Sequence, residues 1–506
     1  MVTRVTNQAQ QATALRNIFR ITEDLFRTNE RIATGKRVNR LSDDPAAVRD
    51  GLTLRGSISQ SEQFQRNIEN NRVLSQTADT VLDSLGLNLI RARELGLQSL
   101  SGTNTPSTRA FSATELNALI EQSLDAANTK IKNQFLFSGT AARVQPFLRA
   151  GTEIFYQGNT QQPQIEIAEN QPVGLSLPGS DMLATDLNPA VSGNTLLADL
   201  NGGAGVAAGS FSITDRAGNN AVIAVSPFAT VNTVISAINA AGLNVNASLN
   251  STRTGLLLTD VSPTLTGSLT VADVGNGTTA QDLGIRGLRD GNFSGRDLNP
   301  RVTGATLVAD LNGGQGLTLG TVNVVNGAAS GAVSLSTAAT VTDLLNVFNT
   351  SAFNVTASIN SQGNALRVVS NSASTVAMVL DFGGGTSAED LGVGGSRNVF
   401  LAMSRLQESL AKNDSFGIIA SLDVLEAGLT NLNEARAQLG AIARRLDTTE
   451  SVHESNIVDQ TRQLATVEDA DISLEASNLV QLEFALQATL STTARIIRPS
   501  LLDFLG

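Results

Sequence analysis

The chain has 506 residues, of which 41% are hydrophobic and 16% are charged, and its formal net charge at pH 7 is −11. It contains no cysteine and no tryptophan, one histidine (His453) and one tyrosine (Tyr156). This inventory excludes disulfides, cysteine-ligated metal centres and thiol catalysis, and the acidic charge repels nucleic acid and anionic lipid. Composition therefore predicts a structural protein of several domains, without cofactor or metal, rather than an enzyme.

The N-terminal flank begins with a polar segment and continues as an amphipathic helix. The first twenty residues contain no apolar core and no small-residue cleavage site, so we expect no cleaved secretory signal peptide. No apolar run is long enough to span a bilayer, so we expect no membrane insertion. Leu15, Ile18, Leu25 and Ile32 then fall on one heptad seam, which predicts a helix with a single apolar stripe.

A polar segment from Gly35 to Pro45 interrupts this helix. Asp44 stands where an N-cap side chain is expected, and Pro45 occupies the first position of the next helix. The adjacent carboxylates of Asp43 and Asp44 could also form a catalytic pair, but capping explains them better. Two further helical faces follow, with Leu82, Leu85, Leu89 and Ala92 on the first and Leu116, Ile120, Leu124, Ala127 and Ile131 on the second.

The centre of the chain has a different composition from its flanks. Residues 171–395 hold 31 of the 44 glycines but only 21 of the 81 charged residues. Abundant glycine, threonine, valine and asparagine with little charge indicates short strands and turns. The flanks are rich in leucine, alanine, glutamate, arginine and glutamine, which favour helix. The central block is therefore predicted to be an insertion between two helical ends.

The central block also repeats itself. Asp186–Pro189 recurs as Asp297–Pro300, 111 residues later. Each copy contains one short helical pattern, at residues 231–238 and 341–348, among alternating patterns typical of half-buried strands. The glycine-rich turns of the two copies lack the spacing of a nucleotide-binding loop. Two copies predict a duplicated α+β module rather than a solenoid.

The C-terminal flank carries the longest periodic pattern in the chain. Alternate steps of three and four residues from Leu422 to Val467 give mostly apolar positions, which predicts one long coiled-coil-like helix. His453 falls in a core position of this pattern, where we expect it to set helix register rather than to bind metal. A second helix is predicted from Leu474 to Ile497, before Pro499.

The expected fold is mixed: a long α-helical coiled coil or bundle formed by the N- and C-terminal ends, with two inserted, mostly β, α+β modules in the middle. Apolar seams this long are typical of assembly surfaces. The predicted domains are 1–44 with 455–506, 45–170 with 396–454, 171–290, and 291–395. The predicted assembly seam comprises Leu15, Ile18, Leu25, Ile32, Leu422, Leu425, Leu429, Leu432, Leu439, Leu446, Ile457, Leu464, Leu486, Leu490, Leu501, Leu502 and Phe504.

Several segments of the two flanks resemble the flagellin superfamily. They are residues 32–39 and 42–47, Arg91–Leu95, Asn133–Gly139, Ala485–Ala488 and Ser500–Leu505. The segment at Asn133 and the C-terminal ending are similar to the hook–filament junction branch of that superfamily, the hook-associated protein 3 type. The residues that carry the family signature are Gly35, Arg37, Asn39, Asp43, Asp44, Pro45, Arg91, Arg93 and Glu94.

The resemblance implies a structural component of the bacterial flagellum. Members of this family pair their two ends as an innermost domain and carry variable inserts outside. They are secreted unfolded through the flagellar type III export apparatus without a cleaved signal, so the expected location is extracellular, in the flagellum. The implied partners are further copies of the chain in a ring, a neighbouring hook-associated protein, flagellin, the export apparatus and an export chaperone. The implied mechanism is coupled folding and assembly of the terminal helices.

Two other functions remain open from the sequence. The chain could be a flagellin that builds the filament itself, and copy number separates this from a junction protein, because a junction needs only a ring. It could also be a surface adhesin that binds glycans or host proteins through residues 171–395. Measurable ligand binding by that fragment would favour the adhesin.

Overall fold

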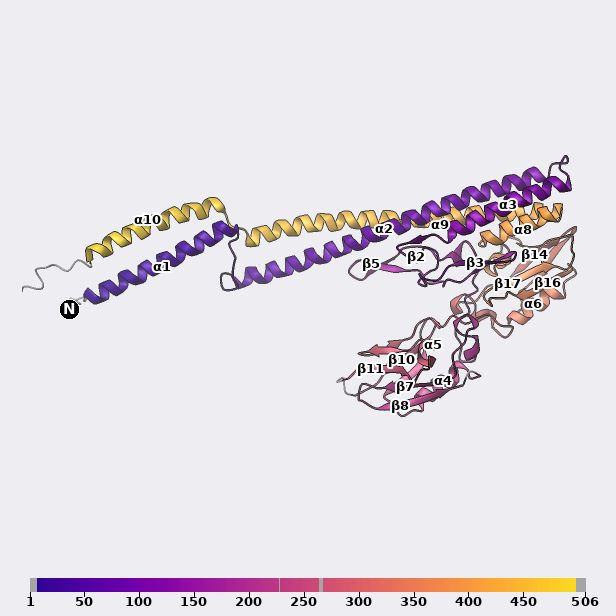
Figure 1. Ribbon diagram of the computed structural model, residues 1–506, viewed down its shortest axis with the longest axis horizontal. Helices are drawn as coiled ribbons and strands as arrows, with labels where there is room; N and C mark the ends of the chain where they lie inside the picture. Colours follow the sequence, from indigo (N-terminus) through magenta and orange to yellow (C-terminus); the bar gives the residue numbers. More distant parts are fainter. Residues whose placement is uncertain (1–6, 227, 264–266, 497–506) are drawn as a thin grey trace, which may run out of the picture. The chain divides into compact units, whose positions relative to one another are not determined.

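The computed structural model describes residues 7–226, 228–263 and 267–496 (Figure 1). Long helices occupy both ends of the chain, and small antiparallel sheets lie between them, which confirms the predicted fold class. The N-terminal helices are α1 (Asn7–Thr34), α2 (Pro45–Ser99) and α3 (Pro106–Ala127), and the C-terminal helices are α8 (Val399–Ala411), α9 (Ser415–Glu468) and α10 (Ile472–Ile496).

The chain divides into two compact units. The first contains the chain up to Asn70, residues 166–172, and the chain from Arg445 onward. The second contains residues 71–165 and 173–444. The long helices α2 and α9 each contribute one part to either unit.

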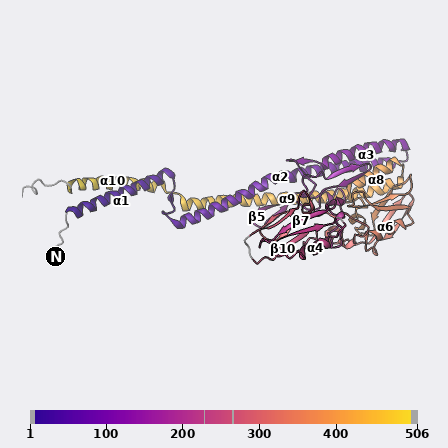
Figure 2. The same cartoon turned by 60° about the horizontal axis from the view of Figure 1, so that its bottom comes forward.

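In the first unit α1 and α10 lie side by side, as both views show (Figures 1 and 2). A row of less exposed positions in α1 recurs at alternating steps of four and three residues, which is the spacing of a two-helix seam. They are Ala14, Ile18, Ile21, Leu25, Thr28 and Ile32.

The same unit holds the start of α2 against the end of α9. The Phe64 ring stacks on the imidazole of His453, with ring centroids 5.3 Å apart. A hairpin of β5 (Gln164–Ala168) and β6 (Gln171–Gly174) brings Ile167 to this contact, where its side chain is fully buried. His453 Nε2 lies 2.7 Å from the carbonyl oxygen of Ile167, and because a carbonyl can only accept, Nε2 donates. The lone histidine therefore ties α9 to the hairpin at a fixed position.

The second unit begins as a helical bundle with one hydrophobic core. The rest of α2, α3, α8 and the start of α9 fill it with large side chains, among them Leu85, Leu89, Leu116, Phe400 and Leu425. The α3 helix starts with a capping box in which Thr105 and Thr108 each bond the other's backbone, and it ends at Ala127. The predicted second face therefore runs too far, because Ile131 belongs to a strand.

Two short hairpins follow α3 and pack on this bundle. Phe147 lies 5.5 Å from Tyr156 and 5.2 Å from Phe400, measured between ring centroids. The Tyr156 hydroxyl donates to the carbonyl oxygen of Phe137 at 2.8 Å, and burial raises its pKa well above the ordinary value. The strands are β1 (Lys130–Ile131), β2 (Gln134–Phe135), β3 (Phe147–Ala150) and β4 (Glu153–Tyr156).

The described residues of the first central repeat form a core of their own, to which two sheets and two helices contribute. Its sheets have the strand orders β12-β11-β7-β8 and β13-β10-β9. Thr230 caps α4 by accepting from the backbone N–H of Thr233, and the predicted helix at 231–238 is confirmed. The elements are β7 (Gly209–Thr214), β8 (Asn220–Val225), α4 (Val231–Asn239), β9 (Val245–Leu249), β10 (Leu256–Asp260), β11 (Leu269–Asp273), α5 (Thr279–Asp282), β12 (Gly287–Arg289) and β13 (Phe293–Ser294).

The second repeat has a core of its own, and its elements follow the order of the first repeat from β7 to α5. Its sheets are β15-β14-β18 and β16-β17, and Thr340 and Asp343 form a capping box at the predicted helix, which is also confirmed. The elements are β14 (Thr321–Asn326), β15 (Ala329–Ser334), α6 (Val341–Asn349), β16 (Val355–Ile359), β17 (Leu366–Ser370), β18 (Ala377–Asp381) and α7 (Ser387–Asp390).

Among the described residues, it is the second repeat that packs one sheet face against the helical bundle. Met378 of β18 belongs to the bundle core, and Leu380 and Val325 pack against it. The adjacent Val379 points to the other face, into the core of the repeat. The second repeat's sheet is therefore covered on both faces.

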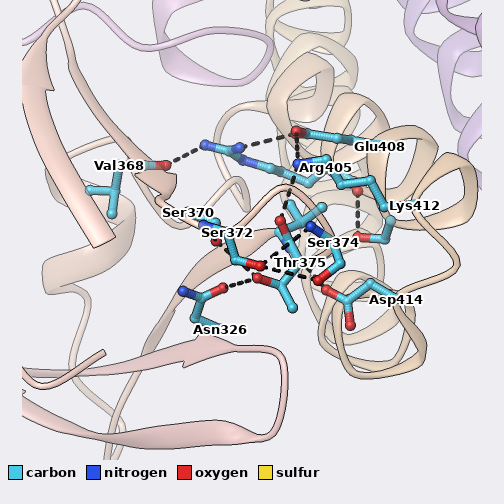
Figure 3. A network of polar contacts seen from close by, with 12 residues as sticks. Asn326, Val368, Ser370, Ser372, Ser374, Thr375, Arg405, Glu408, Lys412 and Asp414 are labelled. Carbon is cyan, nitrogen blue, oxygen red and sulfur yellow. Dashed lines mark hydrogen bonds and ion pairs between the residues drawn. The ribbon is translucent and has the colours of Figure 1, made fainter. Parts of the chain in front are cut away.

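Polar contacts fasten the second repeat to α8 and to the start of α9 (Figure 3). Arg405 Nη2 donates to the carbonyl oxygen of Val368 at 2.6 Å, and burial lowers the pKa of this guanidinium while nearby Glu408 opposes the shift. Lys412 Nζ donates to the carbonyl oxygen of Thr375 at 3.1 Å. The backbone N–H of Val376 donates to Asp414 Oδ2 at 2.9 Å. These bonds satisfy buried polar groups where the strands meet the helices.

Candidate assembly surface and its connector

The α1 and α10 pair exposes large apolar side chains outside its own seam. Leu15, Phe19 and Phe26 are 49%, 71% and 70% exposed, and their spacing of four and seven residues places them on one face of α1. On α10, Val480 and Phe484 lie one turn apart, and Phe484 is 67% exposed. We call these five residues the terminal apolar stripe. Exposed apolar groups gathered in this way mark an interaction surface.

Of the four N-terminal residues of the predicted assembly seam, three lie in the seam between α1 and α10. Ile18, Leu25 and Ile32 are half-buried positions of the seam between α1 and α10. Leu15 lies outside that seam, because the seam passes through Ala14, one residue earlier. The prediction omitted Phe19 and Phe26, since they do not continue the heptad pattern that contains Ile18.

The predicted seam in α9 lies largely inside the chain. Leu425, Leu432, Leu439 and Leu446 are buried, and their side chains are therefore unavailable to another subunit in this conformation. The remaining predicted residues are less uniform: Leu422, Leu429, Ile457, Leu464 and Leu486 are half-buried, Leu490 is exposed, and Leu501, Leu502 and Phe504 lie outside the described residues.

Residues 35–44, which we call the connector, join α1 to α2 and clasp the turn between α9 and α10. The backbone N–H of Arg37 donates to the carbonyl oxygen of Glu468 at 2.7 Å, and Arg37 Nη2 donates to that of Val467 at 2.8 Å. The backbone N–H of Ala470 donates to the carbonyl oxygen of Gly35 at 2.9 Å. Gly35 has a φ of +68°, a conformation that glycine adopts without strain. These bonds hold the two chain ends together at this point.

Glu468 is the charged centre of the clasp. Its side chain is buried and accepts from Lys36 Nζ at 3.1 Å and from Arg55 Nη2 at 2.6 Å. A Cβ on Gly51 would lie 2.5 Å from Glu468 Oε1, so the helix approaches the carboxylate closely only because glycine stands there. No local sequence pattern indicates this cluster, since its members are separated by more than four hundred residues.

The two signature carboxylates of the connector act as caps. Asp44 Oδ1 accepts from the backbone N–H of Ala47 at 3.0 Å at the start of α2, which begins at Pro45, so the predicted cap is confirmed. Asp43 Oδ2 accepts from the backbone N–H of Arg40 at 2.9 Å and from that of Asn39 at 3.2 Å. These backbone hydrogen bonds lower the pKa of both carboxyl groups.

The second signature cluster lies on the outside of the helical bundle. Arg91 forms ion pairs with Glu115 of α3 at 2.7 Å and with Glu94 at 3.1 Å, and these contacts raise its pKa. Arg93 pairs with Glu426 of α9 at 2.9 Å. The same helix exposes three apolar side chains nearby, Leu87, Ile90 and Leu97. The signature residues thus bind α2 to its neighbours beside an exposed apolar strip.

The described part of the chain offers little for other chemistry. Within residues 7–226, 228–263 and 267–496, no group of three or more histidine, aspartate or glutamate side chains could hold a metal ion. None of the helices in these ranges is long and apolar enough to cross a membrane.

Comparison with known proteins matches both ends of the chain. The family described as bacterial flagellin N-terminal helical region matches residues 5–142, and bacterial flagellin C-terminal helical region matches residues 422–505. A flagellin of Clostridium tyrobutyricum is 32% identical over 128 residues, which are 25% of this chain and 34% of that protein. Flagellar hook-associated protein 3 of Escherichia coli K12 is 25% identical over 174 residues, 34% of this chain and 54% of that protein.

This chain thus spans about a third to a half of the length of these curated relatives. Among solved structures, flagellar hook associated protein-3 of Legionella pneumophila aligns with 82% of this chain and 98% of its own, at 15% identity and a TM-score of 0.38. The matches at the two ends cover α1, α2, α3, α10 and most of α9, and the signature residues form the caps and ion pairs described above. Both ends of the chain thus match the helical regions of bacterial flagellin, which confirms the predicted resemblance to the flagellin superfamily.

Proposed function

We propose that this chain is a structural protein of the bacterial flagellum that joins the end of the hook to the flagellin filament. The observation that carries the proposal is the terminal apolar stripe, which the paired α1 and α10 leave exposed. A non-catalytic role agrees with the residues described, because the charged clusters at Glu468 and Arg91 consist of mutually satisfied ion pairs. The name of the Escherichia coli relative, flagellar hook-associated protein 3, supports a position next to the hook.

The mechanism we propose is coupled folding and assembly. Burying one phenylalanine side chain fully is worth about 1.5–3 kcal/mol, so Phe19, Phe26 and Phe484 together favour association strongly when neighbouring copies cover them. In this proposal residues 1–44 with 455–506 form the innermost domain and the central repeats face outward. Partners are further copies of the chain in a ring, the adjoining hook-associated protein and flagellin. Delivery uses the flagellar export apparatus and an export chaperone, and the final location is extracellular.

The second candidate is a flagellin that builds the filament, which the 32% identity to the Clostridium protein favours. Copy number separates the two functions. Quantitative mass spectrometry of sheared hook–filament preparations should find this chain in trace amount, retained with the hook fraction. An abundance equal to that of the major filament protein would establish the flagellin instead, and absence from the preparation would refute both.

A paired substitution tests the surface itself. Cells carrying the double variant Phe19→Ser and Phe26→Ser should still export the protein, but should fail to retain it in the hook–filament preparation. The matched control is Phe228→Ser, since Phe228 is also a strongly exposed phenylalanine but lies in the first repeat. Retention of the double variant at the level of the control would contradict the proposed role of the stripe.

A further inference from the structure

Ten residues between the hairpins and the first repeat contribute to three separate hydrophobic cores. Leu183 lies in the core of the helical bundle, Leu187 in that of the second repeat, and Val191 in that of the first repeat. All three side chains are almost completely buried. We call residues 182–191 the hub. Because each core contains a residue of the hub, a segment of only ten residues links the three cores.

Equivalent leucines before the two repeats are exchanged between the cores of the repeats. Leu187 comes before the first repeat in sequence, yet its backbone N–H donates to Asn364 of the second repeat at 2.8 Å, and its carbonyl oxygen accepts from Asn312 at 2.8 Å. Its equivalent in the duplicated sequence is Leu298, which comes before the second repeat. Leu298 instead lies in the core of the first repeat, where its backbone N–H donates to Thr254 at 2.9 Å.

The core of the second repeat is therefore completed by a residue that precedes the first repeat in sequence. Leu298 follows the first repeat in sequence and completes its core. The equivalent position in the core of the second repeat is filled by Leu187, which precedes the first repeat in sequence. The ends of the first repeat are held together: the backbone N–H of Val191 donates to Arg253 and that of Leu298 to its neighbour Thr254. Folding of the first repeat thus brings Leu187 to the second repeat without an open loop of about one hundred residues.

Two ion pairs join the repeats at equivalent aspartates. Arg253 Nη2 lies 2.6 Å from Asp310 Oδ1, and Arg301 Nε lies 2.7 Å from Asp199 Oδ1. The two arginines come from different places in the repeat, Arg253 from the turn between β9 and β10 and Arg301 from the linker after Leu298.

In each repeat, the position equivalent to the arginine of the other ion pair holds a small residue. The position equivalent to Arg253 is Gly363, and a Cβ there would lie 2.9 Å from Arg301 Cβ. The position equivalent to Arg301 is Ala190, which lies beside Arg253 near Gly314. Each of the two ion-pair sites therefore has room for one arginine, Arg253 at the first and Arg301 at the second.

From this crossed arrangement we propose that the second repeat is a discontinuous domain with the first repeat inserted into it, and that the hub makes the stability of the second repeat depend on the first. The dependence is one-way. The first repeat contains its own closing residue, Leu298, but the second repeat requires both Leu187 and an intact first repeat to present it.

Hydrogen exchange on the full-length chain tests this dependence. Leu187→Ala should accelerate exchange in β14–β18 and α6 by roughly thirtyfold or more, the effect of a buried leucine truncation, and should leave β7–β11 protected. Leu298→Ala should accelerate exchange in the first repeat and also in the second. The matched control is Leu288→Ala, since Leu288 is an exposed leucine of β12 and should change neither repeat.

The alternatives give different patterns. If the repeats were independent, Leu298→Ala would leave β14–β18 unchanged, and that result would overturn the proposal. Acceleration in the first repeat alone by Leu187→Ala would overturn it as well. Should either alanine variant lose its helical circular dichroism, Leu187→Val and Leu298→Val replace the pair, with the same asymmetry expected at smaller amplitude.

Discussion

Replacing Gly51 by alanine tests how firmly the connector clasp holds its carboxylate. In a helix interior this change ordinarily stabilises a protein by about 0.5–1 kcal/mol, because glycine has more conformational entropy to lose. At Gly51 the new Cβ would lie 2.5 Å from Glu468 Oε1. The alanine therefore fits only if the carboxylate shifts, which disturbs the contacts of its other oxygen, Oε2, with Lys36 and Arg55.

The expected magnitude follows from these two contacts. Both cations are nearly half exposed, so each ion pair contributes only about 0.5–1 kcal/mol after solvent screening. Losing both costs about 1–2 kcal/mol, which offsets the helix gain. Gly51→Ala should therefore be neutral or destabilising by up to about 1.5 kcal/mol. In a Glu468→Ala background the obstacle is gone, and the same change should stabilise by about 0.5–1 kcal/mol.

The assay is native-state hydrogen exchange at two amides whose bonds cross the clasp, those of Arg37 and Ala470. Their opening free energies, measured in the four members of the cycle, give the coupling directly. Gly56→Ala is the matched control, because Gly56 lies in the same helix and no atom is within 4 Å of its added Cβ. Stabilisation of the clasp by Gly51→Ala to the same extent as by Gly56→Ala would refute the reasoning.

Three further predictions concern single residues. Burial raises the folded pKa of Asp186 to about 6 from 3.8, so its ionisation destabilises the fold progressively between pH 4 and 6; Asp186→Asn should flatten this pH dependence in thermal unfolding and stabilise by up to about 3 kcal/mol at pH 7. Asp44→Ala should destabilise the start of α2 by about 1 kcal/mol, seen as faster exchange at the Ala47 amide. Met378→Thr should cost about 2–4 kcal/mol in chemical unfolding, whereas Thr270→Ser at the equivalent position of the first repeat should be nearly neutral.

Periodicity predicted the long helices well because helix spacing is a local property of the chain. It was less reliable about what each helix faces. Steps of three and four residues define a seam only relative to a partner helix. In α1 the positions that face α10 pass through Ala14, Ile18 and Thr28. Leucines such as Leu432 satisfy the same pattern but pack within the chain. Apolar spacing alone does not distinguish an internal seam from a surface between subunits.

The contacts that sequence reasoning missed all join distant segments. Glu468 receives its cations from Lys36 and Arg55, and nothing near Glu468 in sequence marks it as different from other helix-end glutamates. The crossed placement of Leu187 and Leu298 is hidden for a related reason. The two residues occupy identical local motifs. Only the three-dimensional structure shows that Leu187 lies in the core of the second repeat and Leu298 in the core of the first.

The duplicated repeats show how one fold acquires two surroundings. The matching strand registers make Met378 equivalent to Thr270, and Leu380 equivalent to Ala272, on the outer face of each sheet. In the second repeat these positions are large and apolar because the helical bundle covers them. In the first repeat they are small or hydroxylated, which suits a face in water. Once the register is known, the sequence therefore indicates which copy docks on the bundle. The same comparison explains why the arginines and small residues alternate between the copies: duplication supplies equivalent positions, and the contacts between the repeats require them to differ.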